Sequence, residues 1–160
     1  MSSASGADRE LRRAVASDAA AITELVQRAY AHYPERIGVR PAPMDADYAD
    51  EIARKEVWVA EGSGEIQAIL VLRHEADHSF VDNVAVAPDA QGEGLGARLL
   101  TLAEARTAAS GRREIRLLTN ERMHENRALY AHLGWKQYDH RRDGGFSRVF
   151  FRKALRADGP

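Results

Sequence analysis

The sequence predicts an α/β fold of the α+β kind, in which a mixed, mostly antiparallel central sheet of six to seven strands is flanked by about four helices. Two observations carry this expectation. Residues 62–64 (Gly-Ser-Gly) separate two short apolar runs, which is the signature of an antiparallel hairpin. Residues 80–119 read as strand, glycine-rich loop, helix and strand, and a helix between two strands favours parallel pairing.

The N-terminal half contains two helical patterns separated by a proline-rich segment. Apolar residues recur at helical spacing from a cap at Ser17 or Asp18 to about His32, and residues 45–55 predict a shorter helix. Between them, residues 34–44 hold three prolines and a glycine and predict an ordered loop. Apolar runs predict strands at residues 11–15, 56–61 and 65–73.

The C-terminal half predicts four further strands and two helices. Pro88 ends the strand at 80–87, and glycines end the helices that begin near Leu95 and Met123. A turn at residues 143–145 (Asp-Gly-Gly) joins the last two strands. The predicted ranges are 80–87, 114–119, 135–141 and 146–153 for strands, and 95–110 and 123–133 for helices.

Length and composition favour one domain at residues 9–155, with polar tails at 1–8 and 156–160. The 23 basic and 24 acidic residues leave a net charge of −1, which gives no global field to recruit nucleic acid or a membrane. No cysteine is present, so disulfides, thiolate nucleophiles and cysteine metal sites are excluded, and we expect no metal. No apolar run suits a signal core or a membrane span, so a cytoplasmic location is expected.

The segment Gln91-Gly92-Glu93-Gly94-Leu95-Gly96 is difficult to explain by folding alone, because each glycine costs a helix about 1 kcal/mol relative to alanine. The first amides of a helix lack intrahelical acceptors and lie at the positive end of the helix dipole. Without Cβ atoms, such a loop can close on a phosphate. The segment therefore predicts an anion site, with a diphosphate as the natural ligand.

These residues resemble the Gcn5-related N-acetyltransferase (GNAT) family in three places. The loop at 91–96 is similar to the family's Gln/Arg-x-x-Gly-x-Gly/Ala pyrophosphate loop. Val84-Ala85-Val86-Ala87-Pro88 resembles the strand end whose backbone pairs with the pantetheine amides of acetyl-CoA. Asn126-Arg127-Ala128-Leu129-Tyr130, followed by Leu133-Gly134-Trp135, resembles a second family motif in looser form.

The resemblance implies acetyl-CoA as co-substrate and an N-acetyltransferase activity. Asn126 and Tyr130, four residues apart on one helix face, would contact pantetheine and the sulfur. The implied cofactor-binding residues are Val84, Ala85, Val86, Gln91, Gly92, Glu93, Gly94, Leu95, Gly96, Ala97, Asn126 and Tyr130.

The expected catalytic residues are Tyr130, as proton donor to the departing thiolate, and Asp82, as the base that takes the amine's proton through water. Strand alternation places Asp82 on one face with Phe80, Val84 and Val86, and Asn83 on the other. Without a cysteine or a recognisable serine nucleophile, the expected chemistry is direct transfer in a ternary complex.

The expected acceptor is a primary amine of a small molecule or an amino-acid-like compound, because the near-neutral charge disfavours very basic partners. In GNAT enzymes the segment between the first two helices helps to line the acceptor site. Two arginines of that segment would bind a carboxylate. The expected substrate-binding residues are Tyr33, Arg36, Arg40 and Met44.

Two other functions remain open. Gly92-x-Gly94-x-x-Ala97 also satisfies a Rossmann dinucleotide fingerprint, although residues 88–91 separate it from the strand and an antiparallel meander precedes it. A non-catalytic acyl-CoA-binding or sensor module would use the same fold. Sheet edges near the C-terminal strands are suited to forming a homodimer.

Overall fold

The structure is a computed structural model that describes residues 9–38, 40–143 and 146–156, with the side chains of residues 36, 37 and 143 left out. The predicted tails at 1–8 and 156–160 therefore lie outside the described residues, except for Arg156. The two glycines of the predicted turn, Gly144 and Gly145, lie outside them as well.

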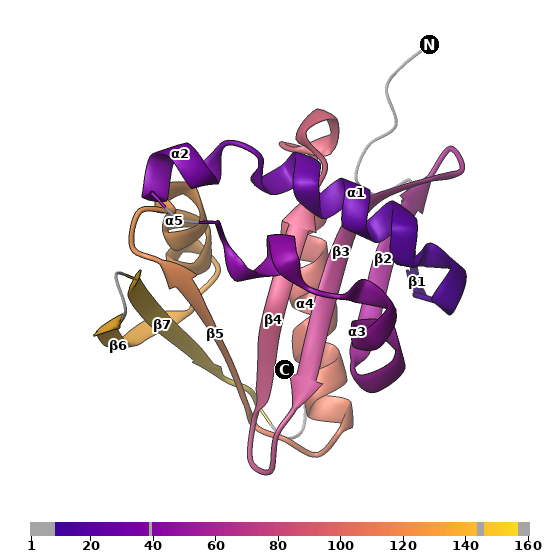
Figure 1. Ribbon diagram of the computed structural model, residues 1–160. Coiled ribbons are helices and arrows are strands. Elements are labelled where there is room, and N and C mark those ends of the chain that lie inside the picture. The colour runs from indigo at the N-terminus through magenta and orange to yellow at the C-terminus, as the bar shows by residue number, and fades with distance from the viewer. Residues whose placement is uncertain (1–8, 39, 144–145, 157–160) are drawn as a thin grey trace.

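The described strands form one seven-stranded sheet in the order β1-β2-β3-β4-β5-β7-β6 (Figure 1). All neighbouring strands pair antiparallel except β4 and β5, which pair parallel as predicted. The glycine hairpin between β2 and β3 is also confirmed. The strands are β1 Glu10–Arg13, β2 Glu56–Gly62, β3 Glu65–His74, β4 Ser79–Val86, β5 Glu114–Asn120, β6 Lys136–Asp143 and β7 Phe146–Ala154.

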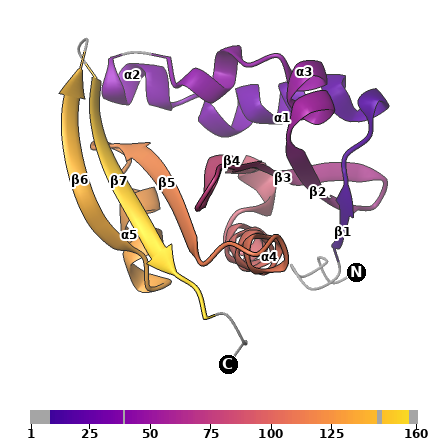
Figure 2. The ribbon, with the colours of Figure 1, turned by 90° about the horizontal axis from the view of Figure 1, so that it is seen from below.

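Helices cover both faces of the sheet (Figure 2). One face carries α1 (Ala19–Tyr30), α2 (Tyr33–Ile37) and α3 (Tyr48–Arg54), and the other carries α4 (Leu95–Ala109) and α5 (His124–His132). Lys153 of β7 links the second pair, because its Nζ atom contacts Glu104 of α4 and the Leu133 carbonyl just after α5. Among the described residues, no helix is long and apolar enough to cross a membrane.

The proline-rich segment is more helical than predicted. Part of residues 34–44 forms α2, where proline is tolerated in the first turn because the N–H it lacks would have no helical partner. Gly38, with φ 80°, ends this helix. A 3-10 helix at Ala42–Asp45 follows. The described part of the segment thus contains two short helices, where an ordered loop was predicted.

β4 and β5 separate along their length. Their parallel ladder joins Ser79–Val81 of β4 to Ile115–Leu117 of β5 and stops there. β4 continues to Val86 and β5 to Asn120, and Figure 1 shows the two strands diverging. Beyond Val81, no strand in the described part of the chain pairs with this edge of β4, so its backbone groups are left for water or a ligand.

Asp82 occupies a β-bulge where the strands begin to separate. In the ladder with β3, Val81 pairs with Leu72 and Asn83 with Val71, so Asp82 is one extra residue in β4. An extra residue reverses the alternation of the side chains that follow it.

Asp82 shares a face with Phe80 as predicted, since Arg73 contacts both, but the predicted separate face of Asn83 and the grouping of Asp82 with Val86 are wrong. Both side chains reach the face covered by α3, since Asp82 lies 2.8 Å from Lys55 Nζ and Asn83 donates to the Tyr48 hydroxyl at 3.0 Å. Val86 faces α4 instead, because its Cγ2 lies 3.8 Å from where a Cβ at Gly96 would stand.

A buried carboxylate ties β2 and β3 to α4. Glu56 is 8% exposed, and its oxygens accept from Arg106 Nε at 2.6 Å and Trp58 Nε1 at 3.0 Å. His74 Nε2 lies 2.7 Å from the other oxygen. Burial alone would raise the pKa of Glu56, but the hydrogen bonds from Arg106, His74 and Trp58 outweigh it and lower that pKa to about 2.

This depressed pKa predicts acid sensitivity. Because the folded-state pKa of Glu56 lies below its ordinary value of 4.5, its contribution to stability is complete above that value and is lost as the pH falls toward about 2. The shift corresponds to about 3 kcal/mol. We expect urea unfolding to show a fall of this order between pH 5 and 2, and Glu56→Gln, which is less stable at pH 7, to show a much flatter profile. Parallel profiles would contradict the assignment.

Candidate active site

Two cavities meet where β4 and β5 diverge. One measures about 490 Å³ and lies between β4, the glycine loop and α5, while the other measures about 400 Å³ and lies between β4, β5 and β7. We call them the loop cavity and the strand cavity. Four residues line both: Tyr30, Val84, Asn126 and Tyr130.

The loop cavity combines the N-terminus of a long helix with a glycine loop. Gly92 and Gly94 have φ values of 85° and 82°, in the left-handed region where a Cβ is strained. A Cβ built at either position meets no atom within 4 Å, so the space above the loop is open. The loop therefore presents backbone N–H groups and the positive end of the α4 dipole to this cavity.

The predicted cofactor residues gather here with one exception. The loop cavity is lined by Val84, Ala85, Val86, Gln91, Gly92, Gly94, Leu95, Gly96, Ala97, Asn126 and Tyr130. Glu93 is absent from this lining, and its carboxylate lies 3.1 Å from Arg9 Nη2. This pairing offsets a negative charge that would otherwise repel an anion bound at the loop.

Tyr130 lies where the two cavities meet, and its hydroxyl forms no hydrogen bond with the described residues. The ring is 5% exposed and packs against Trp135 and Phe151, with centroid distances of 6.2 Å and 5.7 Å. Burial, and then the nearby Tyr33, raises the pKa of Tyr130 well above its usual range, so the phenol stays protonated.

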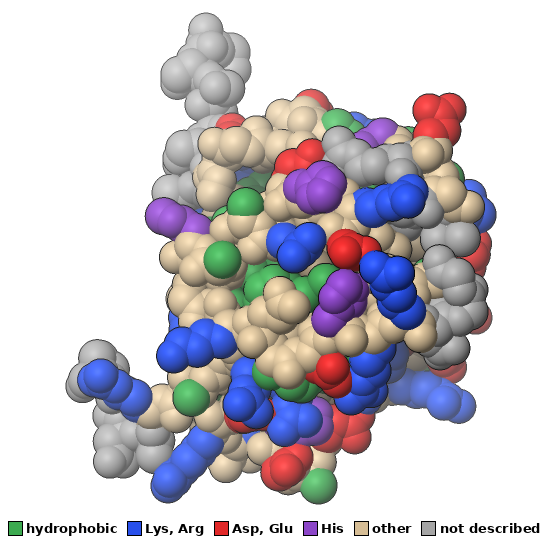
Figure 3. All heavy atoms as spheres, turned by 90° about the vertical axis from the view of Figure 1, so that its left-hand side faces the viewer, with side chains coloured by type: hydrophobic (Ala, Val, Ile, Leu, Met, Phe, Trp, Pro, Cys, Tyr) green, Lys and Arg blue, Asp and Glu red, His purple; other side chains and the backbone are tan. Residues whose placement is uncertain are grey.

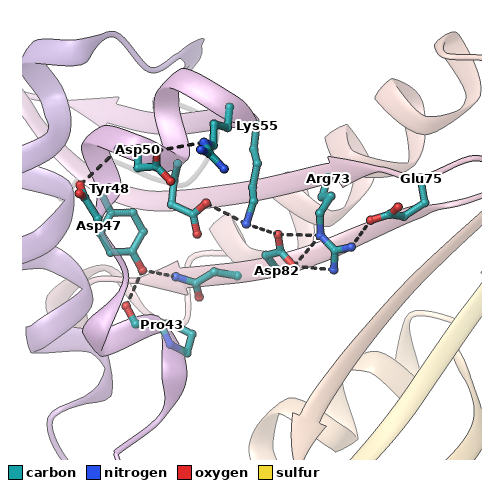
Figure 4. A network of polar contacts seen from close by, with 11 residues as sticks. Pro43, Asp47, Tyr48, Asp50, Lys55, Arg73, Glu75 and Asp82 are labelled. Carbon is teal, nitrogen blue, oxygen red and sulfur yellow. Dashed lines mark hydrogen bonds and ion pairs between the residues drawn. The ribbon is translucent and has the colours of Figure 1, made fainter.

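Asp82 lines the strand cavity between two cations, as Figure 4 shows. Its Oδ2 lies 2.8 Å from Lys55 Nζ, and Arg73 donates to both carboxylate oxygens at 3.1–3.3 Å. Lys55 and Arg73 also contact Glu51 and Glu75. Asp82 is thus part of an extended ion-pair network at the edge of the cavity.

A buried hydrogen-bond chain lies beside the strand cavity, and three of its members, Tyr30, Asn83 and Pro43, line it. Tyr30 donates to Asn83 Oδ1 at 2.7 Å, Asn83 donates to Tyr48, and Tyr48 donates to the Pro43 carbonyl at 2.7 Å. Burial raises the pKa of both tyrosines above the usual range. The chain connects α1, β4 and α3 to the Pro41–Pro43 segment, which lines the strand cavity.

Comparison with known proteins identifies the family. Residues 53–137, just over half of the chain, match the family model described as "Acetyltransferase (GNAT) domain". The chain belongs to the GNAT acetyltransferase family. No curated protein sequence resembles this GNAT chain closely enough to count as a match.

Solved structures with similar folds are GNAT enzymes. The PaiA N-acetyltransferase of Thermoplasma acidophilum, solved with coenzyme A, is 19% identical with a TM-score of 0.77 over 92% of this chain and 99% of its own. The ribosomal-protein-S18-alanine N-acetyltransferase of Escherichia coli is 21% identical with a TM-score of 0.76, over 92% and 94%. A phosphinothricin acetyltransferase of Sinorhizobium meliloti, solved with acetyl-CoA, is 20% identical with a TM-score of 0.74, over 95% and 90%. At these identities, the likeness concerns the fold.

Acetyl-CoA is the co-substrate of GNAT enzymes, and the residues of this GNAT domain fit it. The open cradle above Gly92 and Gly94 suits a diphosphate, and the unpaired edge of β4 beside Val84–Val86 suits the pantetheine amides. When bound, acetyl-CoA supplies the activated acetyl group. The Rossmann alternative is wrong, because the loop follows an antiparallel meander in a GNAT domain.

The predicted acceptor residues are not brought together. Tyr33 is buried and lines the loop cavity, not the strand cavity. Met44 is buried in the core, and Arg40 pairs with Asp45 at 3.0 Å. Neither residue is part of the lining of the loop cavity or the strand cavity. The side chain of Arg36 lies outside the described residues.

Several residues of this GNAT site escape sequence reasoning. The strand cavity takes Arg148 and two phenylalanines from β7, far along the chain from the glycine loop. Only the pairing of β7 with β5 brings them there, and no spacing in the sequence indicates that pairing. Tyr30 had a weak signal, as the aromatic residue that ends α1.

Proposed function

We propose that this GNAT acetyltransferase transfers the acetyl group of acetyl-CoA directly to a primary amine of a small-molecule or amino-acid-like acceptor. The meeting of the two cavities at Tyr130 carries the proposal, because it allows an amine in the strand cavity to face a thioester in the loop cavity. The amine forms an N–C bond as the C–S bond breaks, the amine loses one proton, and the thiolate of CoA gains one.

The volume of the strand cavity supports a small acceptor. About 400 Å³ lies within the usual range for small-molecule sites. Fold likeness alone does not choose the acceptor, since the similar enzyme from Escherichia coli is named for an alanine of a ribosomal protein.

Proton transfer is assigned to Asp82 of the strand cavity and to Tyr130 at the junction. Asp82 would accept the amine's proton through water, and the adjacent cations Lys55 and Arg73 disfavour a positive charge on the acceptor amine. Tyr130 would donate to the departing sulfur. With ordinary pKa values, full transfer from a phenol to a thiolate is already uphill by about 2 kcal/mol, and the raised pKa of Tyr130 makes it more so, so donation accompanies C–S cleavage.

The Asp82 role predicts a changed pH–rate profile. We expect Asp82→Asn to lower kcat/KM about a hundredfold at pH 7, because the amine must then reach its neutral form unaided. The deficit should shrink as the pH rises toward the pKa of the amine. Glu75→Gln, which removes another partner of Arg73 but does not line the cavity, is the matched control. Equal rates for the two variants would exclude Asp82 as the base.

The proposed function is tested by binding and turnover together. Calorimetry should show binding of acetyl-CoA but not of NADH, and a panel of amines should release free CoA thiol. Binding without turnover of any amine would favour the non-catalytic acyl-CoA module. An acetyl-enzyme trapped in a single turnover would exclude direct transfer. A homodimer and a cytoplasmic location stay predictions.

A further inference from the structure

The charged side chains that line the strand cavity have partners within the protein. Arg73 donates to the Asp82 carboxylate and also pairs with Glu75. Arg148 packs on the Phe146 ring, with its Cζ atom 4.7 Å from the ring centroid. Apart from the base role proposed for Asp82, these charges serve contacts within the protein, so they do not indicate a charged acceptor.

The surface next to this cavity carries charges of both signs. Arg116 on β5 pairs with Glu114, and Arg141 on β6 pairs with Asp139. Figure 3, which views the side of the molecule where β6 and β7 lie, shows Lys and Arg side chains interspersed with Asp and Glu. A surface of mixed sign exerts little long-range attraction on an anion or a cation. Charge therefore does not select the acceptor from solution.

Much of the remaining lining is apolar and only partly buried. Leu118 of β5 is 39% exposed and is, with Val15, one of the exposed large hydrophobic side chains of the described residues. Phe80, Phe146 and Phe150 are half-buried. Of these five residues, all except Val15 line the strand cavity. Apolar surface in a concave site favours a ligand that covers it and releases the water there.

The four apolar residues Phe80, Leu118, Phe146 and Phe150 lie on one face of the sheet, and we call them the apolar wall. Leu118 and Phe150 are opposite each other across β5 and β7, so their side chains are neighbours. Phe146 lies four residues before Phe150 on β7 and hence on the same face. Phe80 pairs with Arg116 of β5, two residues before Leu118, which places Phe80 on this face as well.

The apolar wall adjoins the proposed base. The parallel ladder ends with Val81 opposite Leu117, so Asp82 and Leu118 follow at the same level on the two strands as these separate. Asp82 lies on the face of the apolar wall, because it shares that face with Phe80. An amine held near Asp82 therefore has apolar side chains beside it.

We propose that the acceptor amine carries an uncharged apolar group of about six carbons and that the apolar wall binds this group. This inference rests on the proposed function and names the acceptor class for the same site. Neighbouring strands lie about 5 Å apart, so a group of this size extends from an amine beside Asp82 on β4 toward β5 and β7. Leu118, at the level of Asp82, and its neighbour Phe150 are the expected contacts.

The test compares straight-chain amines of similar basicity, so that the fraction of neutral amine is the same for each. The acceptors are ethylamine, hexylamine and 5-aminopentanol, in which a hydroxyl replaces the terminal methyl group of hexylamine. For kcat/KM from thiol release, we expect hexylamine to exceed ethylamine at least tenfold, because each buried CH2 group adds about fourfold. Hexylamine should exceed 5-aminopentanol at least fivefold, since burial of a hydroxyl without a partner is unfavourable.

Three variants assign the preference to the apolar wall. Leu118→Thr, which keeps a residue suited to a strand, should lower the ratio of kcat/KM for hexylamine to that for ethylamine at least threefold. Leu118→Met should keep most of this ratio, because it nearly conserves volume and polarity. Val15→Thr is the matched control, since it makes a similar change at the other exposed hydrophobic side chain, outside the cavity, and it should keep the full ratio.

The outcomes separate this inference from the proposed function. Equal kcat/KM for hexylamine and 5-aminopentanol would overturn the apolar site and leave acetyl transfer intact. Binding of acetyl-CoA with no turnover of any of the three amines would overturn it too. An equal fall of the ratio in Leu118→Thr and Val15→Thr would exclude the apolar wall as the binding surface. Absence of acetyl-CoA binding would instead overturn the proposed function.

Discussion

Tyr130→Phe is expected to lower kcat about a hundredfold while leaving acetyl-CoA affinity and melting temperature nearly unchanged. The hydroxyl has no hydrogen-bond partner among the described residues, so its removal leaves no protein group unsatisfied. The ring contacts with Trp135 and Phe151 remain in the variant. A loss of rate without a loss of stability would mark the hydroxyl as a group that acts in the reaction.

Tyr138→Phe is the control for this variant. Tyr138 lies on β6, where its ring contacts Phe150 at 6.0 Å, and it lines neither cavity. The kcat of Tyr138→Phe should match that of the wild-type enzyme when both are measured by release of free CoA thiol. A Tyr130→Phe enzyme with kcat within twofold of this control would remove the proton-donor role and leave the cofactor site standing.

Local patterns predicted the elements of this fold because each depends on neighbours in sequence. The hairpin of β2 and β3 follows from its glycine turn, and the parallel pairing of β4 and β5 follows from the intervening α4. The Asp82 bulge could not be predicted, because it depends on how β4 meets β3. Because of that one extra residue, the side chains of Asp82 and Asn83 both lie on the face of the sheet that α3 covers.

The two cavities of the candidate site also differ in how far the sequence could predict them. The loop cavity takes most of its lining from β4, the glycine loop and α5, where the sequence predicted cofactor residues, but also from the end of α1, where it predicted none. The strand cavity also needs β7, whose place beside β5 comes from long-range pairing. The sequence placed acceptor recognition at Arg36 and Arg40, whereas the arginines that line this cavity among the described residues are Arg73 of β3 and Arg148 of β7.

Gly94→Ala should weaken acetyl-CoA binding at least tenfold. Gly94 precedes α4 with φ 82° and lines the loop cavity, so a methyl group both strains the backbone and enters the space that a diphosphate needs. The strain costs about 1 kcal/mol, which lowers the melting temperature of a domain of this size by about 2–4 °C. Calorimetry and thermal unfolding of the same preparation measure the two effects.

Gly111→Ala separates strain from obstruction. Gly111 has φ 86° just after the other end of α4, and a Cβ there also meets no atom within 4 Å. Its substitution should therefore cost similar stability but leave acetyl-CoA affinity unchanged, because it does not line the loop cavity. If both variants lost affinity equally, the effect of Gly94→Ala would be general destabilisation. If neither did, the amides of this loop would not hold the diphosphate, and the case for a nucleotide cradle at α4 would fail.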